Sequence, residues 1–155
     1  MRKLTPFTTP LRLTPSQLYR SFYMPLITRV VANEKIGELL YKIFLSRGEF
    51  DPAIPYEPKS VYDESLRLAD IIETYPVAWV DNLRVNEANR CRGHGTWLLQ
   101  EFEAACIEGF CKLAVLKVGW NSPEEKDQNL HFYTKRGWEI VQPSPIHSYL
   151  AFKSL

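Results

Sequence analysis

A short turn rich in arginine and glycine carries the clearest chemical pattern in the sequence. It reads Arg90-Cys91-Arg92-Gly93-His94-Gly95 and is followed by Thr96. Gly93 and Gly95 lack a Cβ atom, so the backbone there can take strained angles and approach a ligand closely. The turn leads into a predicted helix from Thr96 to Glu108, whose free N–H groups and dipole favour an anion. With two arginines and the Thr96 hydroxyl beside them, these features predict a pyrophosphate-binding site.

Two common phosphate-binding loops do not fit this turn. A Walker loop ends in Gly-Lys followed by Ser or Thr, whereas this turn ends in Gly-His-Gly-Thr. A dinucleotide-binding turn would need a third glycine at position 98, where Leu98 stands. It would also favour an acidic residue at the end of the next strand, and that position is Trp120.

The residues on either side of the turn predict a strand, a helix and a second strand. Residues 77–85 and 112–120 are mostly apolar, which is typical of strands covered on both faces. The helix between them has an apolar face, and Gly109 is expected in a left-handed cap at its end. This order predicts two parallel strands joined by a right-handed crossover.

The chain then predicts one more helix and a hairpin. The helix is expected from about Glu125 to Arg136, followed by strands at 138–141 and 148–153. The short link at 143–145 contains two prolines and makes these strands a plausible antiparallel pair.

Residues 27–46 allow two interpretations. Residues 27–32 are rich in β-branched side chains and predict a strand. The apolar residues that follow, from Ile36 to Phe44, have helical spacing, which favours a helix. The alternative is a hairpin turn at 33–37 that leads into a strand up to Leu45.

The remaining segments of the first half are read from local signals. A short strand is compatible with residues 11–13, and a helix is expected from Thr14 to the residue before Pro25. Residues 48–60 predict a loop, and a helix is expected to begin at Ser60. We therefore interpret residues 48–75 as a loop-plus-helix insertion in a single domain that covers residues 1–155.

Two motifs together resemble the GNAT acetyltransferase superfamily. Residues 83–95 look like its acetyl-CoA-binding motif, an apolar strand end followed by Arg or Gln, two residues, Gly, one residue and Gly or Ala. Residues 132–138, Phe-Tyr-Thr-Lys-Arg-Gly-Trp, look like its later motif, an aromatic-Tyr pair on a helix followed by Gly and an aromatic residue. The resemblance covers residues 76–155. It implies an α/β fold: a mixed, twisted sheet with separated central parallel strands and helices on both faces.

The resemblance also implies roles for individual residues. The strand end would offer backbone groups to the pantetheine arm and the acetyl carbonyl, the loop would hold the pyrophosphate, and Tyr133 would protonate the departing thiolate. Asn often stands seven residues before this Tyr in the family, but here the position is Lys126, and Asn129 is the possible substitute. The implied cofactor-binding residues are Leu83, Arg84, Val85, Arg90, Cys91, Arg92, Gly93, His94, Gly95, Thr96 and Asn129.

Asp81 is the candidate general base. It is a carboxylate in an otherwise apolar strand, and it is separated from Leu83 and Val85 by even steps, so alternation would put it on their face. Burial there would raise its pKa. The alternative is a strand irregularity at Asp81-Asn82. For Tyr133, the alternative to the acid role is a core aromatic residue.

Composition narrows the class of partner. The formal net charge of +1 argues against electrostatic nucleic-acid binding, and no apolar run is long enough to span a membrane. Three cysteines at irregular spacing predict reduced thiols in a cytoplasmic protein, and neither His131 nor His147 has metal-ligand spacing to a partner.

These features lead to one function and one alternative. The predicted function is direct transfer of acetyl from acetyl-CoA to a primary amine on a small molecule or peptide, without a metal, in a possible homodimer. The alternative is a non-catalytic acyl-CoA-binding module for regulation or assembly.

Overall fold

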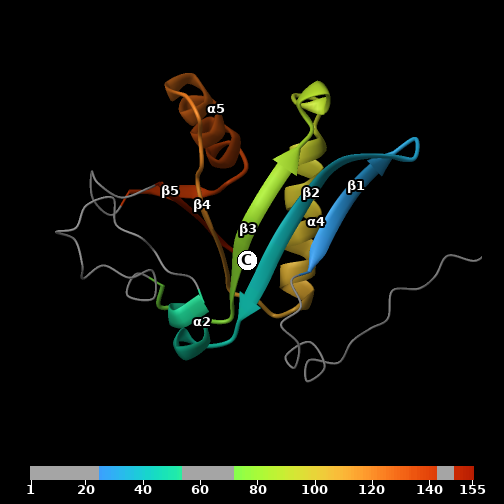
Figure 1. Ribbon diagram of the computed structural model, residues 1–155. Helices are drawn as coiled ribbons and strands as arrows, with labels where there is room; N and C mark the ends of the chain where they lie inside the picture. The colour runs from blue at the N-terminus through green and yellow to red at the C-terminus, as the bar shows by residue number, and fades with distance from the viewer. Residues whose placement is uncertain (1–24, 54–71, 143–148) are drawn as a thin grey trace, which may run out of the picture.

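The sheet of this protein is built around one parallel pair of strands. The computed structural model describes residues 25–53, 72–142 and 149–155. In these residues, six strands form one mixed sheet in the order β1-β2-β3-β4-β6-β5 (Figure 1). The strands are β1 Leu26–Val31, β2 Glu34–Phe44, β3 Val77–Val85, β4 Leu113–Lys117, β5 Glu139–Val141 and β6 Leu150–Ser154. The helices are α2 Arg47–Ala53, α4 His94–Glu108 and α5 Pro123–Thr134, with a 3₁₀ turn at Glu87–Asn89.

Strands β3 and β4 are parallel neighbours joined by helix α4, as the sequence predicts. They pair only from Val77 opposite Leu113 to Val80 opposite Leu116. Beyond these residues β3 continues to Val85 beside β2, while β4 continues beside β6. Figure 1 shows the two strands diverging towards the end of the sheet that carries α5. The predicted fold class is confirmed.

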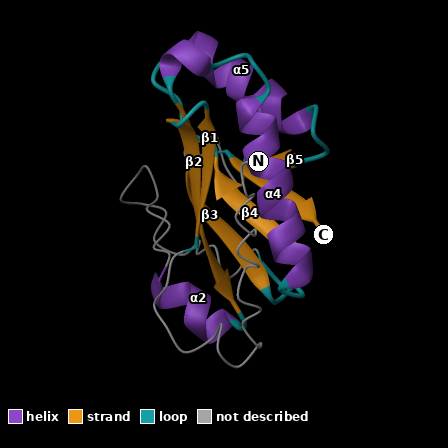
Figure 2. Ribbon diagram, turned by 90° about the vertical axis from the view of Figure 1, so that its right-hand side faces the viewer, coloured by secondary structure: helices purple, strands orange, loops and turns teal. Residues whose placement is uncertain are grey.

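Apolar side chains cover both faces of the sheet. Helices α4 and α5 lie on one side, and α2 lies at the opposite end of the sheet (Figure 2). Strands β2, β3, β4 and β6 contribute residues to both clusters. The cluster on the α4 side includes Leu39, Tyr41, Ala78, Val80, Leu98, Leu99, Phe102, Cys106, Ala114, Leu116 and Ala151. The cluster on the α2 side consists of Phe44, Phe50, Ile72, Val77, Trp79, Val115 and Leu150. Helices therefore pack on both faces of the sheet.

The helix favoured for residues 36–44 is wrong, and this segment is the long strand β2. It forms a hairpin with β1 through Ala32 and Asn33, whose φ angles of 49° and 66° give the left-handed turn that two-residue hairpins need. Strand β2 is paired on both sides and contributes to both clusters. Because both faces of β2 are buried, its apolar residues do not alternate strictly with polar ones, and their spacing resembled that of a helix.

The end of α4 differs by one residue from the prediction. Gly109 has φ −79°, and the left-handed residue is Phe110 with φ 60°. The Cys111 N–H donates to the Cys106 carbonyl at 2.9 Å, which is the long bond of a Schellman cap. A Cβ atom on Gly109 would lie 3.3 Å from Ile43 Cδ1. Gly109 therefore serves close packing of α4 on β2 instead of supplying the left-handed angle.

Other predictions have mixed outcomes. The loop expected at residues 48–60 is wrong in its first part, where α2 forms because Phe50 packs in the core against Phe44 and Trp79, with ring centroids 5.1 and 6.1 Å away. The last two strands do pair antiparallel. The elements expected at 11–13, at 14–24 and from Ser60 lie outside the described residues. Within the described residues, no helix has the length and apolar character needed to cross a membrane.

Candidate functional site

A cleft of about 990 Å³ opens where β3 and β4 separate. One wall is the second half of β3, and the opposite wall comprises the end of β4 and α5. The turn between β3 and α4 lies at its rim. The pairing of β3 with β4 ends at Val80 and Leu116, so after Val80 the edge of β3 that faces the cleft has no strand partner among the described residues. Its N–H and C=O groups are available to an extended, amide-containing ligand.

Asp81 lies at a bulge in β3. Tyr41 pairs with Val80 and Leu40 pairs with Asn82, so Asp81 is the extra residue between them. Alternation is interrupted there, since Val80 and Leu83 are three residues apart and both pack on the α4 side. The irregularity considered as the alternative is confirmed, so the even steps from Asp81 to Leu83 do not by themselves determine the face of the Asp81 side chain. Asp81 lines the cleft but is exposed, so the expected burial is absent.

The turn before α4 has the backbone geometry of an anion site. Cys91 and Gly93 both have positive φ angles, 58° and 81°, and Gly93 is the N-cap of α4. No side chain caps the helix, and its first N–H groups have no acceptor within the helix. Arg90 bends back to Val85, with a long contact of 3.4 Å from Nε to the carbonyl oxygen. The first turn of α4 therefore presents unpaired donors to the rim of the cleft.

Gly95 has a different task from the one expected. A Cβ atom on it would lie 3.2 Å from Phe132 Cζ and 3.8 Å from Val85 Cγ2. Its missing side chain lets the start of α4 approach α5 and the end of β3. Gly93, in contrast, has open space around the position of a Cβ atom and needs glycine for its backbone angle.

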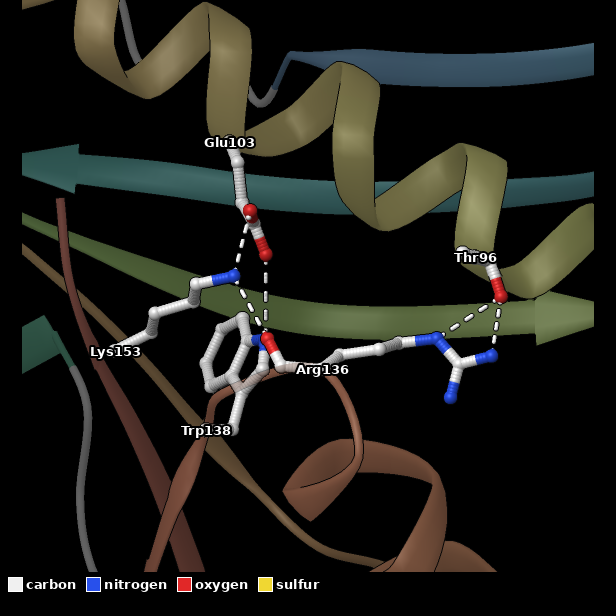
Figure 3. Close-up of polar contacts among 5 residues, drawn as sticks. All are labelled: Thr96, Glu103, Arg136, Trp138 and Lys153. Atoms are coloured by element: carbon white, nitrogen blue, oxygen red, sulfur yellow. Dashed lines mark hydrogen bonds and ion pairs between the residues drawn. The ribbon is translucent and has the colours of Figure 1, made fainter.

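Thr96 and Arg136 connect the two helices at the rim (Figure 3). Arg136 donates two hydrogen bonds to the Thr96 hydroxyl, from Nε at 2.9 Å and from Nη2. Its Nη1 donates to the Phe132 carbonyl at 2.6 Å, and its guanidinium carbon lies 3.8 Å from the centroid of the Phe132 ring. Arg136 was not among the site residues predicted from the sequence. The available signal was its four-residue separation from Phe132, which in the predicted helix up to Arg136 would put both on one face.

Tyr133 lies partly buried on α5 between two aromatic rings. Phe132 and Trp138 lie edge-on to it, at centroid distances of 5.1 and 6.0 Å. Burial raises the pKa of Tyr133 to about 12, so its phenol is neutral at physiological pH. Tyr133 also lines the cleft, and its hydroxyl makes no hydrogen bond to any described residue. Tyr133 therefore has a ring that packs against neighbouring aromatic residues and a hydroxyl that is available to a ligand in the cleft.

Asn129 ties α5 to the end of β4. Its Nδ2 donates to the Gly119 carbonyl at 2.7 Å. Its side-chain oxygen is left as an acceptor on the wall of the cleft. The start of α5 is fixed separately by Ser122, whose side chain accepts from the Glu125 N–H at 3.1 Å.

Most of the predicted site residues meet in this cleft. Those that line it are Asp81, Leu83, Arg84, Val85, Arg90, Cys91, Gly93, Gly95, Thr96, Asn129 and Tyr133. The side chains of Arg92 and His94 do not line it. The polar lining residues that were not predicted from the sequence are Asn82, Asn89, Lys117, Asn121, Ser122, Glu124, Glu125, Gln128 and Arg136.

The sequence matches no family model, and no curated protein sequence matches it significantly. Its structure does match solved ones. A GNAT family acetyltransferase from Elizabethkingia anophelis, with acetyl-CoA bound, superimposes with a TM-score of 0.53 and 20% identity over 84% of this chain and 75% of that one. The chain has the fold of the GNAT acetyltransferases. Ard1 from Thermoplasma volcanium shares this GNAT fold with a TM-score of 0.58 and 18% identity, over 92% of this chain and 80% of that one.

A third structure with the GNAT fold holds coenzyme A. It is the PaiA N-acetyltransferase from Thermoplasma acidophilum, with a TM-score of 0.57 and 13% identity over 85% of this chain and 61% of that one. The GNAT fold of this chain is thus supported by several solved structures whose sequences are very different from its own.

Proposed function

We propose that this protein is an N-acetyltransferase that moves an acetyl group from acetyl-CoA to a primary amine. One observation carries the proposal. The cleft between β3 and β4 brings an unpaired strand edge, an anion-binding helix terminus and the free hydroxyl of Tyr133 to one place. The GNAT-fold structures that hold acetyl-CoA or coenzyme A support it.

The rim of the cleft fits a pyrophosphate. The uncapped N–H groups of α4 are donors, and the helix dipole adds partial positive charge. Arg90 and Arg136 add two full positive charges among the lining residues. Gly93 leaves open space where a side chain would stand, so the backbone can approach a phosphate. Cys91, Arg92 and His94 contribute backbone groups to the pyrophosphate site, and their side chains have no role in the transfer.

The second half of β3 fits the pantetheine arm. Leu83, Arg84 and Val85 lie on its cleft side, where no strand is paired with it. Pantetheine contains two amides, which can pair with backbone groups as a neighbouring strand would. Asn129 offers a further acceptor from the opposite wall.

Bound acetyl-CoA would supply an activated acetyl thioester within reach of an amine. When the nitrogen forms a bond to the acetyl carbon, the carbon–sulfur bond breaks, and Tyr133 gives its phenolic proton to the departing sulfur. The raised pKa of Tyr133 keeps that proton in place until the sulfur becomes basic. Asp81, which is exposed on the bulge and lines the cleft, takes the amine proton through water.

Binding and turnover test this function separately. Titration calorimetry with acetyl-CoA and with ATP should give binding for acetyl-CoA only. Protein that fails to bind acetyl-CoA would exclude the function. A panel of polyamines, aminoglycosides and peptides should then contain an acceptor that releases CoA, quantified by chromatography because exposed Cys91 would react with a thiol reagent. Binding without turnover on any amine would instead support a non-catalytic acyl-CoA module.

A further inference from the structure

Arg136 is a cationic residue of the cleft whose guanidinium is held by several contacts within the protein. Its side chain leaves the chain two residues after α5 and ends at the first turn of α4, forty positions away in sequence. Figure 3 shows the guanidinium beside Thr96, while the carbonyl of Arg136 faces Lys153 on the other side. Arg136 is held at four points: Thr96 by two donors, the Phe132 carbonyl and the Phe132 ring. A side chain held in this way is positioned before any ligand arrives.

The two bonds to Thr96 determine what its hydroxyl can do. A hydroxyl has two acceptor lone pairs and one proton. Arg136 Nε and Nη2 occupy both lone pairs. The hydroxyl can then act only as a donor, and no described residue accepts its proton. Since Thr96 lines the cleft at the third residue of α4, its proton is available to an anion at the rim.

The charge of Arg136 is not balanced by any residue that the structure describes. No acidic side chain among the described residues forms an ion pair with it. It lies instead at the positive end of α4, where a cation interacts unfavourably with the helix dipole. Partial burial also makes the charged form of Arg136 less favourable, and this lowers its pKa. An arrangement that is unfavourable in the free protein becomes favourable when an anion binds between the guanidinium and the helix.

We propose that Arg136 is a positioning residue of the pyrophosphate site, which orients the Thr96 hydroxyl as a donor and adds a full positive charge to the partial charge of the helix terminus. The proposal rests on the function proposed above and identifies a residue that acts on cofactor affinity through Thr96. It assigns Arg136 no part in the transfer of the acetyl group.

A double-mutant cycle on CoA binding tests this role. Titration calorimetry with CoA is done on wild type, Arg136→Met, Thr96→Val and the double variant. Arg136→Met keeps the length of the stem and removes the donors, and Thr96→Val keeps the shape and removes the hydroxyl. Each single change should weaken binding about tenfold, as expected for hydrogen bonds that involve a charged group. On the Thr96→Val background, Arg136→Met should cost clearly less than it costs in wild type, because part of its effect passes through the hydroxyl.

Two controls separate this role from general damage. Lys135→Met removes the same charge from the adjacent, exposed position and should leave CoA affinity within about twofold of wild type. Thr96→Ser keeps the hydroxyl and should bind nearly as wild type does. If Arg136→Met does not fold, as judged by thermal unfolding, Arg136→Lys completes the same cycle with a single point charge in place of the planar donors.

The outcomes are distinct. A loss for Arg136→Met no larger than that for Lys135→Met would overturn the proposal, and so would equal losses on both Thr96 backgrounds. Wild-type protein that does not bind CoA at all would overturn the function itself before the variants are compared.

Discussion

At the scale of single residues, the chemistry depends on Tyr133 having two environments. Its ring lies partly buried between Phe132 and Trp138, while the residue lines the cleft and its hydroxyl has no hydrogen-bond partner among the described residues. Burial raises the phenol pKa to about 12, which favours the protonated form that a general acid needs. Tyr133 therefore satisfies both interpretations of the sequence: its ring packs as an aromatic core residue does, and its hydroxyl is placed for the role of acid.

Replacing Tyr133 by phenylalanine should lower turnover and leave cofactor binding nearly intact. The ring and its packing remain, while the proton donor is lost, so a fall of about 100-fold or more is expected in kcat. Steady-state kinetics with an acceptor from the amine panel, together with CoA titration, would measure both quantities. The raised pKa also predicts that the wild-type pH profile contains no loss of activity from ionisation of Tyr133 below about pH 10.

Tyr41 provides the matched control for this change. Tyr41 lies on β2 and is also a buried tyrosine, and burial raises its pKa to about 12. It packs against Phe102 of α4 and does not line the cleft. Tyr41→Phe should therefore keep wild-type turnover. If Tyr133→Phe turns over as fast as Tyr41→Phe, Tyr133 has no role as the acid.

At the scale of elements, the N-terminus of α4 combines features that come from different parts of the chain. The turn supplies the positive φ angle of Gly93 and the uncapped helix start. The turn after α5 supplies Arg136, and α5 itself packs Phe132 against Gly95. The two glycines are thus required for different reasons, one by backbone geometry and one by the approach of a neighbouring helix.

Gly93→Val should weaken CoA binding by at least about tenfold. A β-branched residue at φ 81° is strongly disfavoured, at a cost of about 1–2 kcal/mol in folding free energy. The open space around Gly93 means that no packing clash adds to this cost, and the new side chain instead obstructs the approach of a phosphate. Titration with CoA measures the affinity, and thermal unfolding measures the stability.

The matched change is Gly48→Val on α2, outside the cleft. A Cβ atom there meets only Ser46 Oγ, at 3.9 Å, so CoA affinity should not change. If Gly93→Val binds CoA as tightly as Gly48→Val does, the turn does not hold the pyrophosphate.

Local patterns predict the elements of the second half well and those of the first half poorly. Helix α4 has polar and apolar faces and a glycine-rich start, so its spacing alone identifies it. Strand β2 lies inside the sheet and buries residues on both faces, so Ile36, Leu39 and Phe44 lose the two-residue period of an exposed strand. Ile36 is an extra residue opposite β1, between the pairs Val30–Lys35 and Arg29–Gly37, and this bulge shifts the alternation of β2 by one residue. The helical spacing seen there arises from tertiary packing, which a short window of sequence does not contain.

At the scale of the whole molecule, a polar network holds both sides of the cleft together. Lys153 on β6 donates to Glu103 on α4 at 2.8 Å and to the Arg136 carbonyl at 2.8 Å. Trp138 Nε1 donates to the other oxygen of Glu103 at 3.3 Å. The network joins α4, β6 and the turn after α5 (Figure 3). It therefore fixes the turn from which Arg136 reaches Thr96.

Lys153→Met should lower the free energy of unfolding by about 1–3 kcal/mol. The change leaves Glu103, whose side chain is 19% exposed, without its charged partner, and it frees the Arg136 carbonyl. Urea unfolding followed by tryptophan fluorescence measures the loss. Lys35→Met breaks an exposed ion pair with Glu38 and should cost less than about 1 kcal/mol. Equal losses in the two variants would show that the network adds nothing beyond an ordinary surface pair.

The sequence by itself determined the parts of the site that depend on neighbours in the chain. The arginine and glycine turn, the amphipathic helix after it and the placement of Tyr133 on a later helix are all visible in local spacing, because each is set by backbone conformation over a few residues. The tertiary structure decided what these parts enclose. The separation of β3 from β4 after Val80, the bulge that exposes Asp81 and the reach of Arg136 to Thr96 all depend on strand pairing and helix packing between distant segments. Such contacts arise from the balance of burial and pairing across the whole molecule, and no spacing of residues along the chain specifies them.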